Sequence, residues 1–426
     1  MANRWRVSRR TFLEQAALGA GGLALSPYVA LADQRGALPD PALTRIDHVV
    51  LVMMENRSFD HMLGWLPGAD GRQEGLTYLD SAGVAHSTFP LAPDYQGCGH
   101  PDPDHTYEGG RVEYNDGACD GWLRAGANDE FAIGYYTQDD LPFYARAATD
   151  WTVCDRYFTS MLGPTFPNRF YQHSAQTDRV NNTFEISTLP TIWDRLAAAG
   201  LTGRYYFQDA PFLGLWGTKY ISISRHYSRF LEACSTGDLP HVSYIDPKFV
   251  QELTGTTTDD HPHADVRDGQ AFLNQVYTAV TTSPAWKRTL LVINYDEWGG
   301  FFEHIPPPTL PIPPASAAAG DVDGLLGFRV PCLIISPYAP RSTVSHTVFD
   351  HTSVLRFIEW RWGLEPLTVR DETANNLAEA LDLRKRSRSA PLYPVPPGPF
   401  GLPCPETEPD KWIALIELAR SMGWPV

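Results

Sequence analysis

The chain has 426 residues and a formal net charge of −16 at pH 7. The charge becomes −19 when residues 1–32, which carry four arginines and one glutamate, are left out. So acidic a protein is a poor partner for nucleic acid, and it is not expected to bind anionic lipid without specificity. An anionic substrate would need a local cation to draw it in, which is a first reason to expect a bound metal ion.

Residues 1–32 have the features of a signal peptide for the twin-arginine export machinery. Ser8-Arg9-Arg10-Thr11-Phe12-Leu13 is a twin-arginine signature, an apolar stretch follows it, and Ala30-Leu31-Ala32 fits a small-x-small cleavage site. An ordinary amphipathic first helix is the alternative. We expect a periplasmic or secreted protein, exported folded. The apolar stretch is too short for a stable membrane span, and we expect no transmembrane segment in the mature chain.

The rest of the chain alternates strand-like and helix-like segments. Apolar and β-branched runs predict strands over 47–54, 150–155, 203–207, 289–295 and 329–336. Helical periodicity predicts helices over 59–64, 191–199, 266–282, 352–362 and 410–422. This order is typical of a three-layer α/β/α fold with a mostly parallel central sheet. We expect a catalytic domain over 33–385, with a loop-rich insertion at 66–149, and a Pro-rich tail with a short helix over 386–426.

Two of the predicted strands end in adjacent oxygen-bearing side chains. One unbroken apolar run leads into Glu55 and Asn56, and another leads into Asp296 and Glu297. Such runs are typical of strands buried on both faces of a parallel sheet, and ligands bind at the carboxyl ends of these strands. Polar residues also end strands simply to reach solvent. Because the same design occurs twice, it favours a metal site between the two strand ends.

The segment Gly163-Pro-Thr-Phe-Pro-Asn-Arg169 adds a hydroxyl group. Thr165 is expected to cap a helix with Pro167 in its first turn, and a helix N-terminus suits a phosphoryl oxygen. Asn168 would help to hold that oxygen. A threonine whose pKa is lowered by a metal becomes a nucleophile; a plain N-cap is the alternative. With the strand-end oxygens, Thr165 would complete an all-oxygen sphere for one divalent ion, Ca²⁺, Mg²⁺ or Mn²⁺, with Zn²⁺ left open.

Loop histidines are candidates for binding or protonating a phosphoryl group. His105 and His261 both lie in polar loops, where either could bind the phosphate or serve as the proton donor to a leaving alcohol. His304 closes the loop after the second acidic strand end, and His226 is a weaker candidate. A single loop histidine is more often solvated surface.

The six cysteines form an even set, so one or two disulfides are expected after export. No Cys-x-x-Cys pair occurs, which argues against a thiolate metal site. Cys154 and Cys332 fall inside apolar runs and are expected to be small buried hydrophobes.

Several of these segments resemble the bacterial phosphoesterase family of non-haemolytic-type phospholipases C and related acid phosphatases. The resemblance covers roughly residues 45–365 and rests on Met53–His61, Gly163–Arg169, His261-Pro262, Tyr295–His304, Val330–Pro337 and Ser345–Phe357. It implies an alkaline-phosphatase-like fold with a metal at the positions of Glu55, Asn56, Asp296 and Glu297. It also implies a nucleophile at Thr165, phosphate-binding or protonating histidines at His105 and His261, and a further match at His226.

The chain departs from that pattern in two places. Glu297 stands where some relatives have a second aspartate, which would alter the metal geometry. The chain ends before the C-terminal β domains of the larger phospholipases, which lowers the expectation of strong lipid-surface binding.

We therefore expect a metal-dependent phosphoesterase acting on a phospholipid or a small phosphoester. The first expectation is a phospholipase C that acts on phosphatidylcholine-like lipids through a phosphothreonine intermediate. An acid phosphatase for small monoesters is the second. A metal-dependent binding protein for a phosphate ligand is the alternative from another class. A sulfatase is disfavoured because the chain has no Cys-x-Pro-x-Arg segment.

Overall fold

The computed structural model describes residues 38–250, 255–387, 389–404 and 411–426. The predicted signal peptide, 1–32, lies outside these residues. The core is an eight-stranded sheet in the order β12-β6-β11-β10-β1-β9-β7-β8. In that order the strands are Thr343–Ser345, Thr152–Cys154, Leu333–Ile335, Thr289–Tyr295, His48–Met54, Val242–Ile245, Gly203–Phe207 and Ser224–His226. Strand β11 runs antiparallel to both neighbours, and every other pair is parallel.

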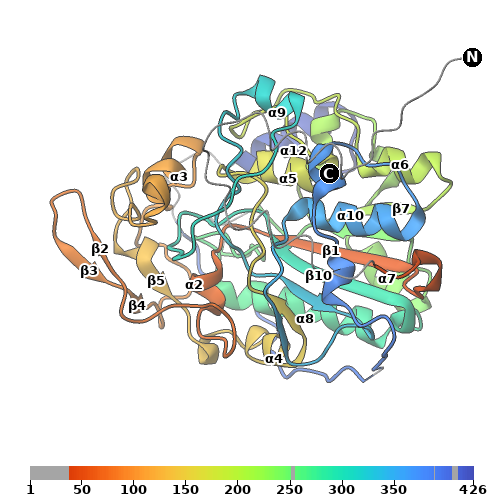
Figure 1. Ribbon diagram of the computed structural model, residues 1–426, viewed down its shortest axis with the longest axis horizontal. Coiled ribbons are helices and arrows are strands. Elements are labelled where there is room, and N and C mark those ends of the chain that lie inside the picture. The colour runs from red at the N-terminus through yellow and green to blue at the C-terminus, as the bar shows by residue number, and fades with distance from the viewer. Residues whose placement is uncertain (1–37, 251–254, 388, 405–410) are drawn as a thin grey trace, which may run out of the picture. The chain divides into compact units, whose positions relative to one another are not determined.

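Helices cover both faces of the sheet (Figure 1). On one face α5 (Thr165–Ser174) packs against α6 (Ile192–Ala198) and α10 (His351–Trp362). On the other face α8 (Val266–Thr282) lies along β10 and packs against α7 (Ser228–Thr236), with α4 (Tyr144–Asp150) nearby. The predicted three-layer architecture with a mostly parallel sheet is confirmed. Its physical basis is that strands β1 and β10 are apolar on both faces and need cover on each.

The remaining helices are short. They are α2 (Phe59–Leu63), α3 (Tyr107–Tyr114), α9 (Pro314–Ala319), α11 (Val369–Thr373) and α12 (Lys411–Ser421). Among the described residues, no helix is both long enough and apolar enough to cross a bilayer.

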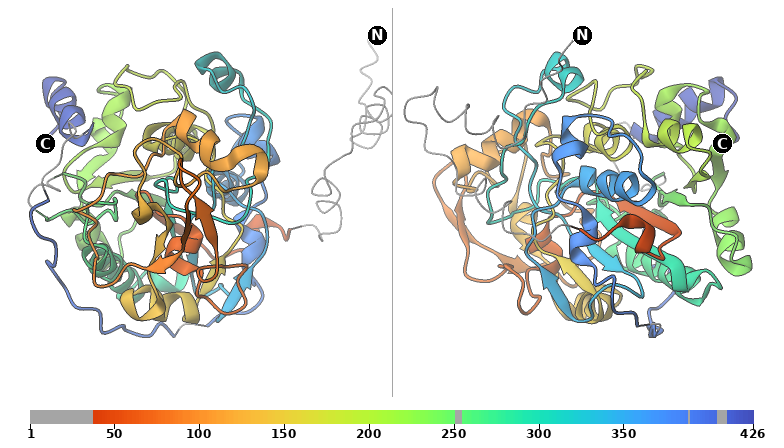
Figure 2. Two further views of the ribbon diagram at one scale, coloured as in Figure 1. Left: turned by 90° about the vertical axis from the view of Figure 1, so that its left-hand side faces the viewer. Right: turned by 45° about the vertical axis from the view of Figure 1, so that its right-hand side comes forward.

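The predicted insertion between α2 and α4 is loop-rich, as expected. It holds the hairpin β2 (Thr77–Leu79) and β3 (Ala85–Ser87), the pair β4 (Phe89–Pro90) and β5 (Gly134–Tyr135), and helix α3. Figure 1 shows it at one end of the sheet, and in the left view of Figure 2 it faces the viewer. The loop that carries His105 comes from this insertion, so the insertion contributes side chains to the sheet edge.

Predicted and observed boundaries agree best where the sequence signal is strong. Helix α8 has the predicted bounds, and Asp350 caps α10 by accepting from the Thr352 and Ser353 amides. The predicted strand 329–336 is shorter, at Leu333–Ile335, since Pro331 cannot donate a ladder hydrogen bond. Strands β8, β9 and β12 were not predicted, because three or four residues are too few for a periodic pattern.

One disulfide is present among the described residues, between Cys98 and Cys404, 306 residues apart. It joins the insertion to the C-terminal tail. Cys154 and Cys332 are buried free thiols on neighbouring strands, as expected. The predicted C-terminal helix is α12, and it packs against the short 3-10 helix Phe212–Trp216.

Candidate active site

The two acidic strand ends lie side by side. Strands β1 and β10 pair in parallel register, with Met54 opposite Tyr295. Beyond the strands, the Asn56 amide donates to Oδ1 of Asp296 at 3.2 Å, and the Arg57 amide donates to the Glu297 carbonyl at 3.1 Å. The juxtaposition that the sequence predicted is therefore present, at the carboxyl ends of two central strands.

The two loops approach so closely that one of them needs glycine. Asn56 has a φ of 59°, in the left-handed region that asparagine tolerates. Gly299 has a φ of 67°, and a Cβ atom there would lie 2.1 Å from the Asn56 carbonyl oxygen. A side chain at Gly299 would thus push the two strand-end loops apart.

Thr165 is the first residue of α5, not its cap. The N-cap is Pro164, and no side chain caps the helix there. The predicted capping role is therefore wrong: the chain enters the helix one residue earlier, and proline has no side-chain acceptor. The Thr165 hydroxyl is buried and has no hydrogen-bond partner within the described chain. A hydroxyl not used for capping is available for chemistry.

Asn168 holds the loop before α5. Its Oδ1 accepts from the Met161 amide at 3.0 Å, and its Nδ2 donates to the Gly163 carbonyl at 2.8 Å. The amide that would contact a substrate oxygen is thus engaged in fixing the position of Thr165. The N–H of Phe166 is also engaged, since it donates to Oδ1 of Asn182 at 2.8 Å.

Arg169 docks α5 onto the strand ends. Its Nε donates to Oδ2 of Asp296 and its Nη1 to Oδ1 of Asp246, both at 2.9 Å, and its Nη2 donates to the carbonyls of Met53 and Met54. Arg169 lies four residues after Thr165, hence on the same side of the helix. This buried ion pair therefore brings the threonine to the edge that carries the carboxylates.

Four buried oxygens at this edge have no hydrogen-bond partner within the part of the chain that the structure describes. They are Glu55 Oε1, Asn56 Oδ1, Thr165 Oγ1 and Glu297 Oε1. Leaving buried acceptors unsatisfied is costly, so a cluster of them fits a site that binds a cation.

The raised pKa values of two carboxylates at this edge also fit a cation site. Burial raises the pKa of Asp296 to about 7, although Arg169 opposes the rise, and burial together with Asp296 raises the pKa of Glu297 well above its usual value. A divalent ion would satisfy these oxygens, so the residues present fit the all-oxygen metal site that the sequence predicted.

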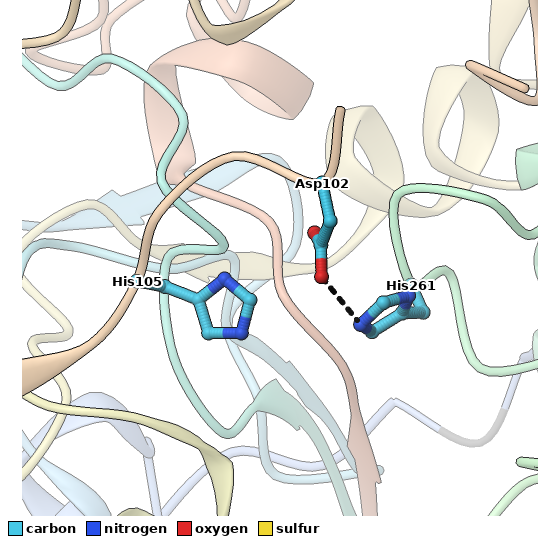
Figure 3. Close-up of side chains that lie close together, drawn as sticks. All are labelled: Asp102, His105 and His261. Atoms are coloured by element: carbon cyan, nitrogen blue, oxygen red, sulfur yellow. Dashed lines mark ion pairs between the residues drawn. The ribbon is translucent and has the colours of Figure 1, made fainter. Parts of the chain in front are cut away.

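Asp102, His105 and His261 form a second group beside the first (Figure 3). One ligand-capable atom from each lies within 4.8 Å of the others. Nε2 of His261 is 3.5 Å from Oδ2 of Asp102, and Nε2 of His105 is 3.6 Å from Oε1 of Glu297. The structure thus brings both predicted histidines to the strand-end carboxylates. Asp102 was not among the predicted site residues, although it lies three residues before His105.

His304 and His226 have different surroundings. Nδ1 of His304 is 2.5 Å from Oδ2 of Asp60, within a buried group that includes Glu303 and Arg329. Arg329 Nη2 donates to Oε1 of Glu303 at 2.6 Å and to Oδ1 of Asp60 at 3.3 Å. The cation beside the carboxylates of Asp60 and Glu303 is therefore the Arg329 guanidinium. His226 is exposed on β8, where Nδ1 lies 2.9 Å from the Ser228 hydroxyl. Their predicted contacts with substrate stay predictions.

Sequence reasoning missed the contribution of the C-terminal helix to the site. The Trp412 indole N–H donates to Oε2 of Glu55 at 3.1 Å, across 357 residues of sequence. Nothing in the local sequence around either residue indicates that contact.

Comparison with known proteins gives consistent results. The profile of the Phosphoesterase family matches residues 46–365. Phospholipase C B of Mycobacterium tuberculosis is 31% identical, over 92% of this chain and 88% of that protein. Non-specific phospholipase C3 of Arabidopsis thaliana is 28% identical, over 82% of this chain and 75% of that protein. A solved structure from Vibrio parahaemolyticus, of a protein in the alkaline phosphatase superfamily, is similar with a TM-score of 0.39 and 10% identity, covering 79% and 72% of the two chains. A TM-score this low carries no functional information.

Proposed function

The chain belongs to the Phosphoesterase family and is a hydrolase of phosphoester bonds, and from this premise we propose that it is a metal-dependent phospholipase C acting on phosphatidylcholine-like lipids. The observation that carries the proposal is the set of four buried oxygens that have no hydrogen-bond partner among the described residues, one of them the Thr165 hydroxyl. The relatives named phospholipase C, aligned over most of their length, support the phosphodiester as substrate.

Glu55, Asn56, Asp296, Glu297 and the Thr165 hydroxyl would hold the ion. A divalent ion there supplies positive charge that lowers the pKa of the threonine hydroxyl and stabilises charge on the phosphoryl oxygens. The all-oxygen donor set favours Mg²⁺, Ca²⁺ or Mn²⁺.

In the proposed reaction Thr165 Oγ attacks phosphorus as its proton passes to solvent. The bond from phosphorus to the threonine oxygen forms, and the bond to the leaving glycerol oxygen breaks. His261 donates a proton to that leaving oxygen, so diacylglycerol departs as the neutral alcohol. The intermediate is a phosphodiester that joins the threonine oxygen to phosphocholine. Water then attacks its phosphorus and gives a proton to His261, and the bond to the threonine oxygen breaks. Phosphocholine departs, and the threonine oxygen takes up a proton from solvent. Two in-line displacements retain the configuration at phosphorus.

Purified protein assayed with three substrates tests this function. Phosphatidylcholine vesicles and p-nitrophenylphosphocholine are expected to be hydrolysed faster than p-nitrophenyl phosphate. Chelation is expected to abolish turnover, and elemental analysis before chelation identifies the ion. Turnover of the monoester alone would make the protein an acid phosphatase. Phosphate binding with no turnover of any ester would make it a binding protein.

We also propose export by the twin-arginine route, on the strength of Arg9 and Arg10 within residues 1–32. Replacing both with lysine is expected to keep the protein inside the cell, as seen by fractionation. A periplasmic or secreted variant with both lysines in place would contradict this route.

A further inference from the structure

The first turn of α12 lies at Glu55. Lys411 Nζ is 3.8 Å from Oε1 of Glu55, and its side chain is 19% exposed. The next residue, Trp412, donates to the other oxygen of the same carboxylate at 3.1 Å. One carboxylate of the proposed metal site therefore contacts two consecutive side chains from the far end of the chain.

Trp412 is held firmly in place. It is buried, and its ring stacks on Phe249 with centroids 3.8 Å apart and planes at 9°. Phe166, the neighbour of Thr165 in α5, packs against it with centroids 5.5 Å apart. Because these contacts fix the indole, they also fix where the preceding lysine enters the site.

Among the described residues of α5, no cation is left to contact a substrate phosphoryl group. The donors of Arg169 are already engaged. Nε donates to Asp296, Nη1 donates to Asp246, and Nη2 donates to the carbonyls of Met53 and Met54. The Asn168 amide and the Phe166 N–H, which the sequence suggested for this task, are also engaged.

The charge count at the site points to the same need. Five carboxylates lie here, from Glu55, Asp102, Asp246, Asp296 and Glu297, against Arg169. With a divalent ion bound, two negative charges would stay uncompensated and would repel an anionic ester. The ammonium of Lys411 reduces this excess to one negative charge and is partly exposed, so it can face a bound anion.

We propose that Lys411 binds a non-bridging phosphoryl oxygen of the substrate, and that Trp412 is a positioning residue that orients Glu55. The inference rests on the proposed phosphoester chemistry and adds a phosphoryl-binding residue to it. The C-terminal helix is thereby part of the active site.

Inorganic phosphate is the probe for Lys411, by calorimetry on the metal-loaded full chain and as an inhibitor of turnover. Lys411→Met is expected to weaken phosphate binding about 10- to 100-fold, the effect of losing one charge-assisted hydrogen bond. Lys411→Arg is expected to restore most of it. The control is Lys385→Met, which removes the same charge from an 89% exposed side chain. This variant is expected to bind phosphate as tightly as the wild type.

The metal content of the same variants separates this role from a structural one. Removing a positive charge beside the ion is expected to leave divalent metal affinity unchanged or higher. A folded Lys411→Met variant that loses its metal would overturn the proposal, as would phosphate affinity within twofold of wild type or wild-type protein that binds no phosphate. If no ester is turned over but phosphate binding still depends on Lys411, the proposed function fails, and Lys411 is a phosphate-binding residue without a role in turnover.

Trp412→Phe tests the positioning role, because phenylalanine keeps an aromatic ring against Phe249 and removes the N–H donor together with part of the indole. Metal affinity is expected to fall about 10-fold, within the range for lost outer-shell partners. The melting temperature is expected to stay within a few degrees of wild type. Unchanged metal affinity in this variant would show that the indole N–H does not position Glu55.

Discussion

The side-chain amide nitrogen of Asn56 lies 3.3 Å from Nε2 of His105. Nδ1 of the same ring lies 2.7 Å from the carbonyl oxygen of Pro103, which can only accept, so Nδ1 carries the proton and Nε2 accepts from Asn56. With its nitrogen on the histidine, the Asn56 amide is oriented and its Oδ1 is left among the unpartnered oxygens. His105 thus orients a proposed metal ligand, and His261 is the better proton donor.

The two histidines are therefore expected to respond differently to the leaving group. His261→Ala should slow hydrolysis of phosphatidylcholine about 100-fold or more, within the range for general acid catalysis. It should slow p-nitrophenylphosphocholine far less, because nitrophenolate leaves without a proton. Steady-state kinetics on both esters measure the difference, with His263→Ala as the control. Equal losses on the two esters would contradict the assignment.

Thr165 is expected to be indispensable for turnover but not for the fold. Thr165→Ala should lower kcat by about 1000-fold or more, since the residual rate would come only from binding and electrostatics. Thr165→Ser keeps a hydroxyl and should retain measurable activity. Acid quenching during turnover of phosphatidylcholine, followed by peptide mass spectrometry, should find phosphocholine on Thr165 in the wild type. An alanine variant with near-normal turnover and bound metal would rule out the threonine nucleophile.

Arg329 is expected to be a structural cation. It is fully buried and pairs with Asp60 and Glu303, so Arg329→Met leaves two buried carboxylates without their partner. The free energy of unfolding should fall by about 3–5 kcal/mol, the cost of breaking a buried ion pair. The control Arg229→Met breaks an exposed pair with Glu232 and should cost less than about 1 kcal/mol. Denaturant unfolding checks both, and similar values for the two variants would contradict the structural role.

His173 is expected to contribute to acid sensitivity. Burial and then Arg169 lower its pKa to about 3, and Trp193 donates its indole N–H to Nδ1 at 3.2 Å. Between pH 6.5 and about 3 the unfolded chain takes up a proton here that the folded chain does not. Stability should therefore fall as the pH drops through that window, by up to ~1.4 kcal/mol per pH unit from this one group.

The variant His173→Phe removes that proton uptake. It should be less stable than wild type at pH 7, because the Trp193 donor loses its acceptor, yet lose less stability on acidification to pH 5. Unfolding free energies at several pH values measure the slope. A slope equal to that of wild type would show that His173 does not titrate on unfolding.

The sequence by itself determined the features that depend on neighbouring residues. Unbroken apolar runs determined strands β1 and β10, and polar residues after each run placed Glu55 and Asp296 at the same sheet edge. The periodicity of 266–282 determined α8. These predictions succeeded because strand burial and helix amphipathicity follow from local spacing alone.

Only the tertiary structure decided which distant side chains complete the site. The pairing of Arg169 with Asp296, the disulfide between Cys98 and Cys404, and the contact of Trp412 with Glu55 join segments 127 to 357 residues apart. No local pattern specifies such contacts, because they form when apolar surfaces from separate segments are buried together and bring particular polar groups within reach. Long-range packing places Asn56 beside His105, and it places α12 against the Glu55 carboxylate.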